Sequence, residues 1–164
     1  MGFIKEVKEP YNQESDVIAL IHYICNKSKC PHSCANVNWL LPRCNLFSNW
    51  DYIADLFLSV QYCRNFNRRL YHIVYSFDNL LDRPNLQMAF NLGNRMLSAY
   101  KPYQSFFVVH ETSKHMHLHI VYNNISIFKQ ANLSEVLNIK YLHSLAEDYI
   151  YSCICRPWFY LICQ

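Results

Sequence analysis

One short segment of the sequence gathers histidines at the spacing of a strand. Four of the eight histidines lie within ten residues, at His110, His115, His117 and His119. Side chains alternate across a strand, so the last three share one face, and Met116 and Leu118 between them point to the other. Imidazoles about 6.6 Å apart along a strand can converge on one ion at about 2.0–2.1 Å per nitrogen. The segment therefore predicts a divalent metal site with coordination positions left open for water or substrate.

The hairpin between two β-rich runs decides which three histidines converge. A loop of four residues (111–114) would place His110 opposite His115, whereas a loop of six (111–116) would place it opposite His117. The second register makes His110, His117 and His119 the ligand set, and the spacing leaves both registers open. The competing interpretation is a polar strand face whose histidines are solvated. Four histidines on adjacent strands favour the metal site.

The elements that must position this segment follow from hydrophobic periodicity. Strands are expected at 3–7, 71–77, 103–110 and 115–127, and helices at about 50–65 and 84–100. Asn12 or Ser15 is expected to cap a first helix that ends near residue 26, and a capping box at Asn132 and Glu135 to start a last helix that ends near residue 153. Residues 27–50 show no period and predict a loop or insertion. The order predicts an α+β fold, an antiparallel β-sheet with helices packed on it, as a single domain over 1–164.

The composition of the chain excludes several classes of protein. The chain has 164 residues, of which 52% are hydrophobic and 16% aromatic, and this excludes intrinsic disorder. Two glycines are too few for a glycine-rich phosphate loop or a dinucleotide fingerprint. The net charge of +3 permits a nucleic-acid partner without arguing for one. The charged first ten residues exclude a signal peptide, and Arg156 and Pro157 interrupt the apolar stretch 149–163, so we expect a cytoplasmic protein without membrane insertion.

The cysteines allow a second, weaker metal hypothesis. Cys30 and Cys34, with Cys25 and Cys44 nearby, have a spacing that a structural zinc site can use. A second closely spaced pair of cysteines or histidines does not follow them. We therefore expect reduced, buried thiols in preference to zinc ligands.

The histidine segment resembles the motif of the HUH (His-hydrophobic-His) endonuclease superfamily. Both 115–117 and 117–119 satisfy the His-hydrophobic-His rule, and the apolar runs 106–109 and 120–122 around them resemble the strand-turn-strand of the relaxase/mobilization nuclease domain. The run 71–77 is similar to the family strand that carries a histidine and a Ser-Phe ending. The segment 22–26 resembles the helical segment that carries the nucleophilic tyrosine. The likeness extends from about residue 17 to about residue 155.

The resemblance implies a site and an activity. His110, His117 and His119 would hold a divalent ion, Mg²⁺ or Mn²⁺ with Zn²⁺ as a further option, and Tyr23 would attack the DNA. His115 and His72 would support the ligands or contact DNA. Glu111 adjoins the first ligand, so its position suits a carboxylate that orients a ligand histidine or assists the metal, and it suits a charged turn residue equally well. The implied activity is a metal-dependent nick in single-stranded DNA at a transfer-origin-like site, through a 5′-phosphotyrosine intermediate. Its setting would be the conjugative mobilization of a plasmid or mobile element, with accessory mobilization proteins as further partners.

Three alternatives to this function stay open at the level of sequence. Tyr149 and Tyr151 follow the histidines, which is the order in replication initiators and single-tyrosine transposases of the superfamily, and we rank them after Tyr23. The modest charge and the short segment after the last helix also fit an inactive or truncated relaxase-like protein that binds single-stranded DNA. A small zinc hydrolase is the third alternative, because three histidines on adjacent strands can also activate water.

Overall fold

The computed structural model describes residues 2–26, 34–38, 40–41, 48–62, 67–79, 81–82, 84–111, 115–128 and 131–155. Within these residues, one antiparallel sheet has the strand order β1-β3-β5-β4-β2. Its strands are β1 (Phe3–Glu6), β2 (Cys34–Val37), β3 (Leu70–Ser76), β4 (Tyr103–Glu111) and β5 (Met116–Ser126). The helices are α1 (Glu14–Cys25), α2 (Trp50–Gln61), α3 (Leu86–Ala99), α4 (Ile139–Cys155) and a short 3-10 helix, η2 (Leu133–Glu135). The predicted α+β class is confirmed.

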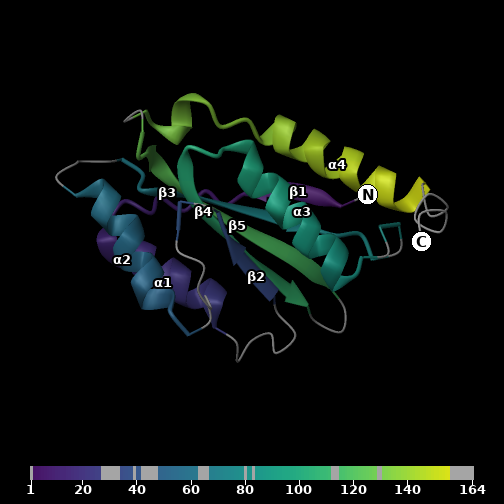
Figure 1. Cartoon of the computed structure of the whole chain (residues 1–164), viewed down its shortest axis with the longest axis horizontal. Helices are drawn as coiled ribbons and strands as arrows, with labels where there is room; N and C mark the ends of the chain where they lie inside the picture. Colours follow the sequence, from purple (N-terminus) through teal and green to yellow (C-terminus); the bar gives the residue numbers. More distant parts are fainter. Residues whose placement is uncertain are drawn as a thin grey trace.

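The two faces of the sheet pack against different helix pairs. Helices α1 and α2 lie together on one face, and α3 and α4 lie together on the other (Figure 1). Alternation along β4 sends Phe106 and Val108 into the core under α1 and α2, and Phe107 and Val109 into the core under α3 and α4. Because both faces are covered, the interior strand β4 is buried from Tyr103 to His110.

The packing of α3 on the sheet depends on a glycine. A Cβ atom at Gly93 would lie 2.7 Å from ring carbons of Phe107, which is fully buried on β4. The bare backbone therefore lets α3 approach the strand more closely than any other residue would allow. The close approach fixes β4 from the α3 and α4 side, and β4 carries His110 near its C-terminal end.

The loop expected over residues 27–50 is partly wrong. The segment contains β2, which pairs with β4 and places Cys34 opposite Val109. This edge strand has four residues, three of them only half buried, so it lacks the alternation that marks a strand in the sequence. Its conformation depends on hydrogen bonds to β4, which is about 70 residues away along the chain, and not on local pattern.

The predicted helix starts also need correction. Gln13, and neither Asn12 nor Ser15, is the cap of α1, and its backbone N–H donates to Asp16 Oδ2 at 2.9 Å. The capping box at Asn132 and Glu135 marks η2 and not α4. The side chains of the two residues bond each other at 3.2 Å. Helix α4 starts after Asn138, whose Oδ1 accepts the backbone N–H of Tyr141 at 3.1 Å.

The prediction for α2 placed its end near residue 65, and the structure ends it at Gln61. Within the described ranges, no helix has both the length and the apolar character needed to cross a bilayer.

Candidate active site

Strand pairing selects one of the two registers that the sequence left open. His110 on β4 lies opposite His117 on β5, and the next pair toward the turn is Glu111 with Met116. His119 lies between β4 and β3, opposite Val108 on one side and Val74 on the other. The alternation along β5 directs both histidines to the face of the sheet that α1 and α2 cover.

Three histidines converge on that face. One nitrogen from each of His110, His117 and His119 lies within 4.8 Å of the others, and among the described residues this is the one group of three metal-ligand side chains that does so. The ring centroids are 4.6 Å apart for His110 and His119, and 4.8 Å apart for His117 and His119. His110 and His119 are buried and His117 is half buried, so the group opens to solvent on the side of His117.

Helix α1 fixes the orientation of His110. The Nε2 atom of His110 lies 2.7 Å from the backbone oxygen of Ile24, in the last turn of the helix. A carbonyl oxygen only accepts, so Nε2 carries the hydrogen and the lone pair of the neutral ring is on Nδ1. The contact joins the end of α1 to the histidine group, one residue from Tyr23.

His119 presents a buried nitrogen without a hydrogen-bond partner in the described part of the chain. Its Nδ1 atom lies 2.8 Å from Nε2 of His72 on β3, whereas its Nε2 atom is buried with no hydrogen-bond partner among the described residues. Burying an unpaired polar atom costs free energy, and such atoms are rare in folded proteins. A metal ion bound at Nε2 would remove that cost, so the donor set fits a divalent cation.

The electrostatic environment keeps these rings neutral. Burial lowers the pKa of His119 strongly, and the neighbouring His72 and His110 lower it further. Burial and then the charge of His110 lower the pKa of His117 as well. Neutral imidazole is the form that binds metal, so the site favours the ligand state at neutral pH.

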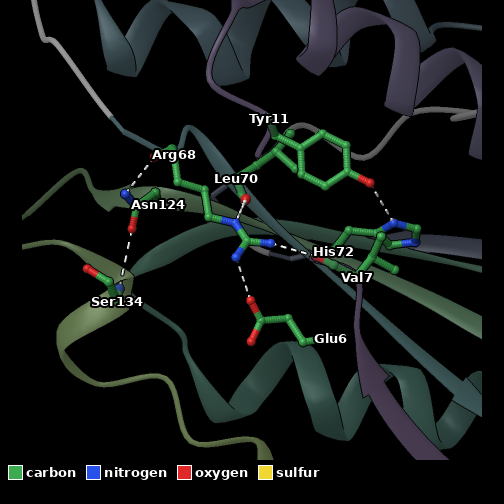
Figure 2. Close-up of polar contacts among 8 residues, drawn as sticks. All are labelled: Glu6, Val7, Tyr11, Arg68, Leu70, His72, Asn124 and Ser134. Carbon is green, nitrogen blue, oxygen red and sulfur yellow. Dashed lines mark hydrogen bonds and ion pairs between the residues drawn. The ribbon is translucent and has the colours of Figure 1, made fainter. Parts of the chain in front are cut away.

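Two further histidines of the sequence analysis lie at different distances from this group. His72 is buried and bonds His119 directly, and burial followed by the charge of Arg68 lowers the pKa of His72 to about 4. Its Nδ1 lies 3.2 Å from the hydroxyl oxygen of Tyr11 (Figure 2). His115 is exposed just before β5 begins and is not part of the converging group.

Glu111 follows His110 on β4, and the alternation of the strand directs it to the opposite face of the sheet. Cys34 on β2 lies opposite Val109, two residues before Glu111 on β4. Burial raises the pKa of the Cys34 thiol, and the negative charge of Glu111 adds to this effect. Cys34 packs under α3 and α4, whereas Cys25 lies in the core under α1 and α2. The two thiols therefore do not face a common site, and the other two cysteines of that hypothesis, Cys30 and Cys44, lie outside the described residues.

The tyrosines proposed as nucleophiles lie on opposite sides of the sheet. Tyr23 is on α1, next to the residue that bonds His110, and 51% of its surface is exposed. It lines a cavity of about 310 Å³ together with Tyr11. Tyr149 and Tyr151 are on α4, which covers the other face (Figure 1). The structure thus brings Tyr23 to the histidine side and separates Tyr149 and Tyr151 from it.

The environment of Tyr149 is that of a packing residue. Its ring is buried, and the guanidinium of Arg95 lies 4.7 Å from the ring centroid. Burial and a bond to Cys153 raise the pKa of Tyr149 to about 12. Tyr151 is 65% exposed on the same helix.

Tyr11 also belongs to this group of contacting side chains. No local pattern marks this residue, because its contact with His72 spans 61 positions of the chain and depends on an unusual backbone conformation. Burial and then the charge of Glu9 raise the pKa of Tyr11 to about 12, so its hydroxyl keeps its proton at neutral pH.

Comparison with known families decides the classification. A family model described as the relaxase, MobA/VirD2-like, nuclease domain matches residues 23–147, which is more than half of the chain. The chain belongs to this family. The matched range contains the three converging histidines, begins at Tyr23 and ends before Tyr149. A search of curated proteins found no significant match. The relaxase domain is thus a nuclease-type domain whose histidine group can hold a divalent ion.

Proposed function

We propose that this relaxase domain nicks one strand of DNA by attack of Tyr23 on a phosphodiester held at a divalent ion, and that His110, His117 and His119 bind this ion. The observation that carries the proposal is the buried Nε2 of His119, which has no hydrogen-bond partner among the described residues, in a histidine that offers a ring nitrogen within 4.8 Å of ring nitrogens of His110 and His117. The family match and the position of Tyr23 at the end of α1 support the same reading.

In this proposal the three histidines are neutral and bind the divalent ion. When bound, the ion would withdraw electron density from the scissile phosphate and offset the charge that develops on its oxygens. Three imidazoles leave positions for water and phosphate oxygens, which suits Mg²⁺ or Mn²⁺, and Zn²⁺ is the alternative. The hydrogen bond from His110 to the backbone oxygen of Ile24 holds the histidine group against the last turn of α1.

Tyr23 supplies the nucleophile. A phenol hydroxyl is a weak acid that holds its proton near neutral pH, so it must lose this proton to solvent or a base as the oxygen approaches phosphorus. A bond then forms between that oxygen and phosphorus, and the bond from phosphorus to the 3′-oxygen of the preceding nucleotide breaks. The 3′-oxygen takes up a proton. The product is a 5′-phosphotyrosine, which keeps a phosphodiester bond and so allows the strand to be rejoined by the reverse reaction.

The remaining predicted residues take supporting roles in this proposal. We assign His115, exposed beside the histidine group, to DNA contact, and His72 to support of His119. Glu111 receives no ligand role, because it points away from the group. The substrate is single-stranded DNA at a transfer-origin-like site on a plasmid or mobile element, and the partners are accessory mobilization proteins. We place this reaction in the cytoplasm, where such DNA is found.

The test compares two tyrosines of equal exposure. Tyr23 and Tyr52 are each 51% exposed, on α1 and α2 respectively. The protein is incubated with Mn²⁺ and a random pool of labelled single-stranded DNA, and covalent adducts are separated on a denaturing gel. We expect adducts with wild type and Tyr52→Phe, and none with Tyr23→Phe or His117→Ala. Adducts that persist in Tyr23→Phe contradict the proposed nucleophile, and binding without any adduct in wild type favours a relaxase-like DNA-binding protein.

A further inference from the structure

The segment between β1 and α1 holds one residue in an uncommon backbone conformation. Tyr11 has a φ angle of +42°, and it is the one non-glycine residue with positive φ in the part of the chain that the structure describes. This region of backbone space is rarely populated by a tyrosine, and such strain persists where the surrounding contacts impose it.

Two arginines hold this segment against the start of β3. The guanidinium of Arg68 donates to Glu6 Oε1 at 2.6 Å and to the backbone oxygen of Val7 at 2.7 Å (Figure 2). The backbone N–H of Arg69 donates to the oxygen of Tyr11 at 2.8 Å, and its Nε atom donates to the oxygen of Asn12 at 3.0 Å. The chain is thus fixed on both sides of Tyr11, next to the strand that carries His72.

The side chains of Tyr11, His72 and His119 form a hydrogen-bonded series that ends in the histidine group. The hydroxyl oxygen of Tyr11 lies 3.2 Å from Nδ1 of His72, and Nε2 of His72 lies 2.8 Å from Nδ1 of His119 (Figure 2 shows the first contact). The last nitrogen of the series is Nε2 of His119, which is buried and unpartnered among the described residues.

The direction of hydrogen bonding along this series decides what His119 can do. If Nε2 of His119 offers a lone pair, its Nδ1 carries the hydrogen and donates to Nε2 of His72. His72 then carries its hydrogen on Nδ1 and needs an acceptor there, and the hydroxyl oxygen of Tyr11, which can accept as well as donate, lies 3.2 Å away. Without that acceptor, His72 is free to reverse its own tautomer and to donate from Nε2. His119 would then carry its hydrogen on Nε2, where the metal ion must bind.

We propose that Tyr11 is a positioning residue of the metal centre, which acts through His72 to hold His119 in the tautomer that offers its Nε2 lone pair. The proposal rests on the proposed metal site and adds to it a residue that lies outside the matched family range. Partners of metal-binding histidines fix ring orientation and tautomer in general, and their removal weakens metal binding by about 10–100-fold.

The experiment replaces Tyr11 by phenylalanine, which removes the hydroxyl and keeps the aromatic ring. We expect Tyr11→Phe to raise the Kd for Mn²⁺, measured by calorimetry, about tenfold. The matched control is Tyr100→Phe, which also removes a bonded hydroxyl from a buried tyrosine, but on the α3 and α4 side of the sheet. The control should keep the wild-type Kd. In a His72→Ala background, Tyr11→Phe should have no further effect, which a general loss of packing would not reproduce.

A second readout needs no metal. The ¹⁵N spectrum of the histidine rings in the metal-free protein reports which nitrogen carries the hydrogen. We expect Nδ1–H for His119 in wild type and in Tyr100→Phe, and a shift toward Nε2–H in Tyr11→Phe. Nε2–H in wild type, or an unchanged tautomer and Kd in Tyr11→Phe, would overturn the inference. Wild type that keeps the expected tautomer but binds no Mn²⁺ would instead overturn the proposed function.

Discussion

A buried amide on β5 gives the sharpest prediction about how the helices on the site face are held. Asn123 is fully buried, and its side chain joins α2 to two strands. Its Nδ2 atom donates to the backbone oxygen of Phe57 at 2.9 Å and to Gln104 Oε1 at 3.0 Å. Its Oδ1 atom accepts from Gln61 Nε2 at 2.8 Å and from the backbone N–H of Ile125 at 3.2 Å.

Asn123→Leu keeps the size of the side chain and removes all four bonds. Gln61 keeps a bond to the backbone oxygen of Arg69 at 2.7 Å, and the backbone oxygen of Phe57 keeps its bond within α2, so the groups that lose most are Gln104 Oε1 and the backbone N–H of Ile125. A buried group without a partner costs about 1–3 kcal/mol, so these two together cost about 3–5 kcal/mol, and the added apolar contact of leucine returns about 1 kcal/mol. We therefore expect the free energy of unfolding to fall by about 2–4 kcal/mol.

Urea unfolding followed by circular dichroism measures this loss. The midpoint should fall by about 1–2 M at an unchanged slope, for a slope of about 2 kcal/mol per M. The control is Asn12→Leu, the same change at an exposed position, which should stay within about 0.5 kcal/mol of wild type. A loss below about 1 kcal/mol in Asn123→Leu would refute the reasoning that this network carries net stability.

Three further predictions concern stabilisation by Mn²⁺, the pH dependence of stability and the packing of α3 on the sheet. Mn²⁺ at a hundredfold excess over its Kd should stabilise wild type by about 2.7 kcal/mol and raise its melting temperature, and the rise should be absent in His117→Ala. Because burial lowers the pKa values of His72 and His119, the unfolded chain takes up protons below about pH 6.5 while the native rings do not. The metal-free protein should thus lose about 2 kcal/mol for each of these rings between about pH 6.5 and pH 5, and an equal urea midpoint at both pH values would contradict buried neutral imidazoles. Gly93→Ala should destabilise the protein, because overpacking against Phe107 costs about 1–3 kcal/mol and outweighs the gain in helix propensity of about 1 kcal/mol. Its melting temperature should therefore fall below that of wild type. A higher melting temperature would show that α3 can shift without cost.

Much of the sheet could be predicted from the sequence, because its central strands have strong patterns. The strand expected at 71–77 is β3, shifted by one residue, and the strands expected at 103–110 and 115–127 are β4 and β5. The edge strand β2 could not be predicted, because its conformation comes from pairing with β4. The start of α4 was misplaced because Asn132 and Glu135 satisfy a local capping pattern that the chain uses for one turn only.

The candidate site, like the sheet, could be predicted from the sequence in part. Alternation along β5 was enough to put His117 and His119 on one face, and the structure selected the register that adds His110. Which side of the sheet each helix covers is a property of the whole topology, so the sequence ranked Tyr23 before Tyr149 but could not place the two on different sides of the sheet. The contact of Tyr11 with His72 was also out of reach, because it depends on backbone contacts made by residues far away along the chain.

The central claim is that Tyr23 attacks DNA beside the histidine group. The most direct measurement is mass spectrometry of proteolytic peptides from wild-type protein after incubation with Mn²⁺ and single-stranded DNA, with the DNA digested to the attached nucleotide. The account predicts a nucleotide on the peptide that contains Tyr23. A nucleotide on the peptide that contains Tyr149 and Tyr151 would contradict it, since these tyrosines lie across the sheet from the histidines.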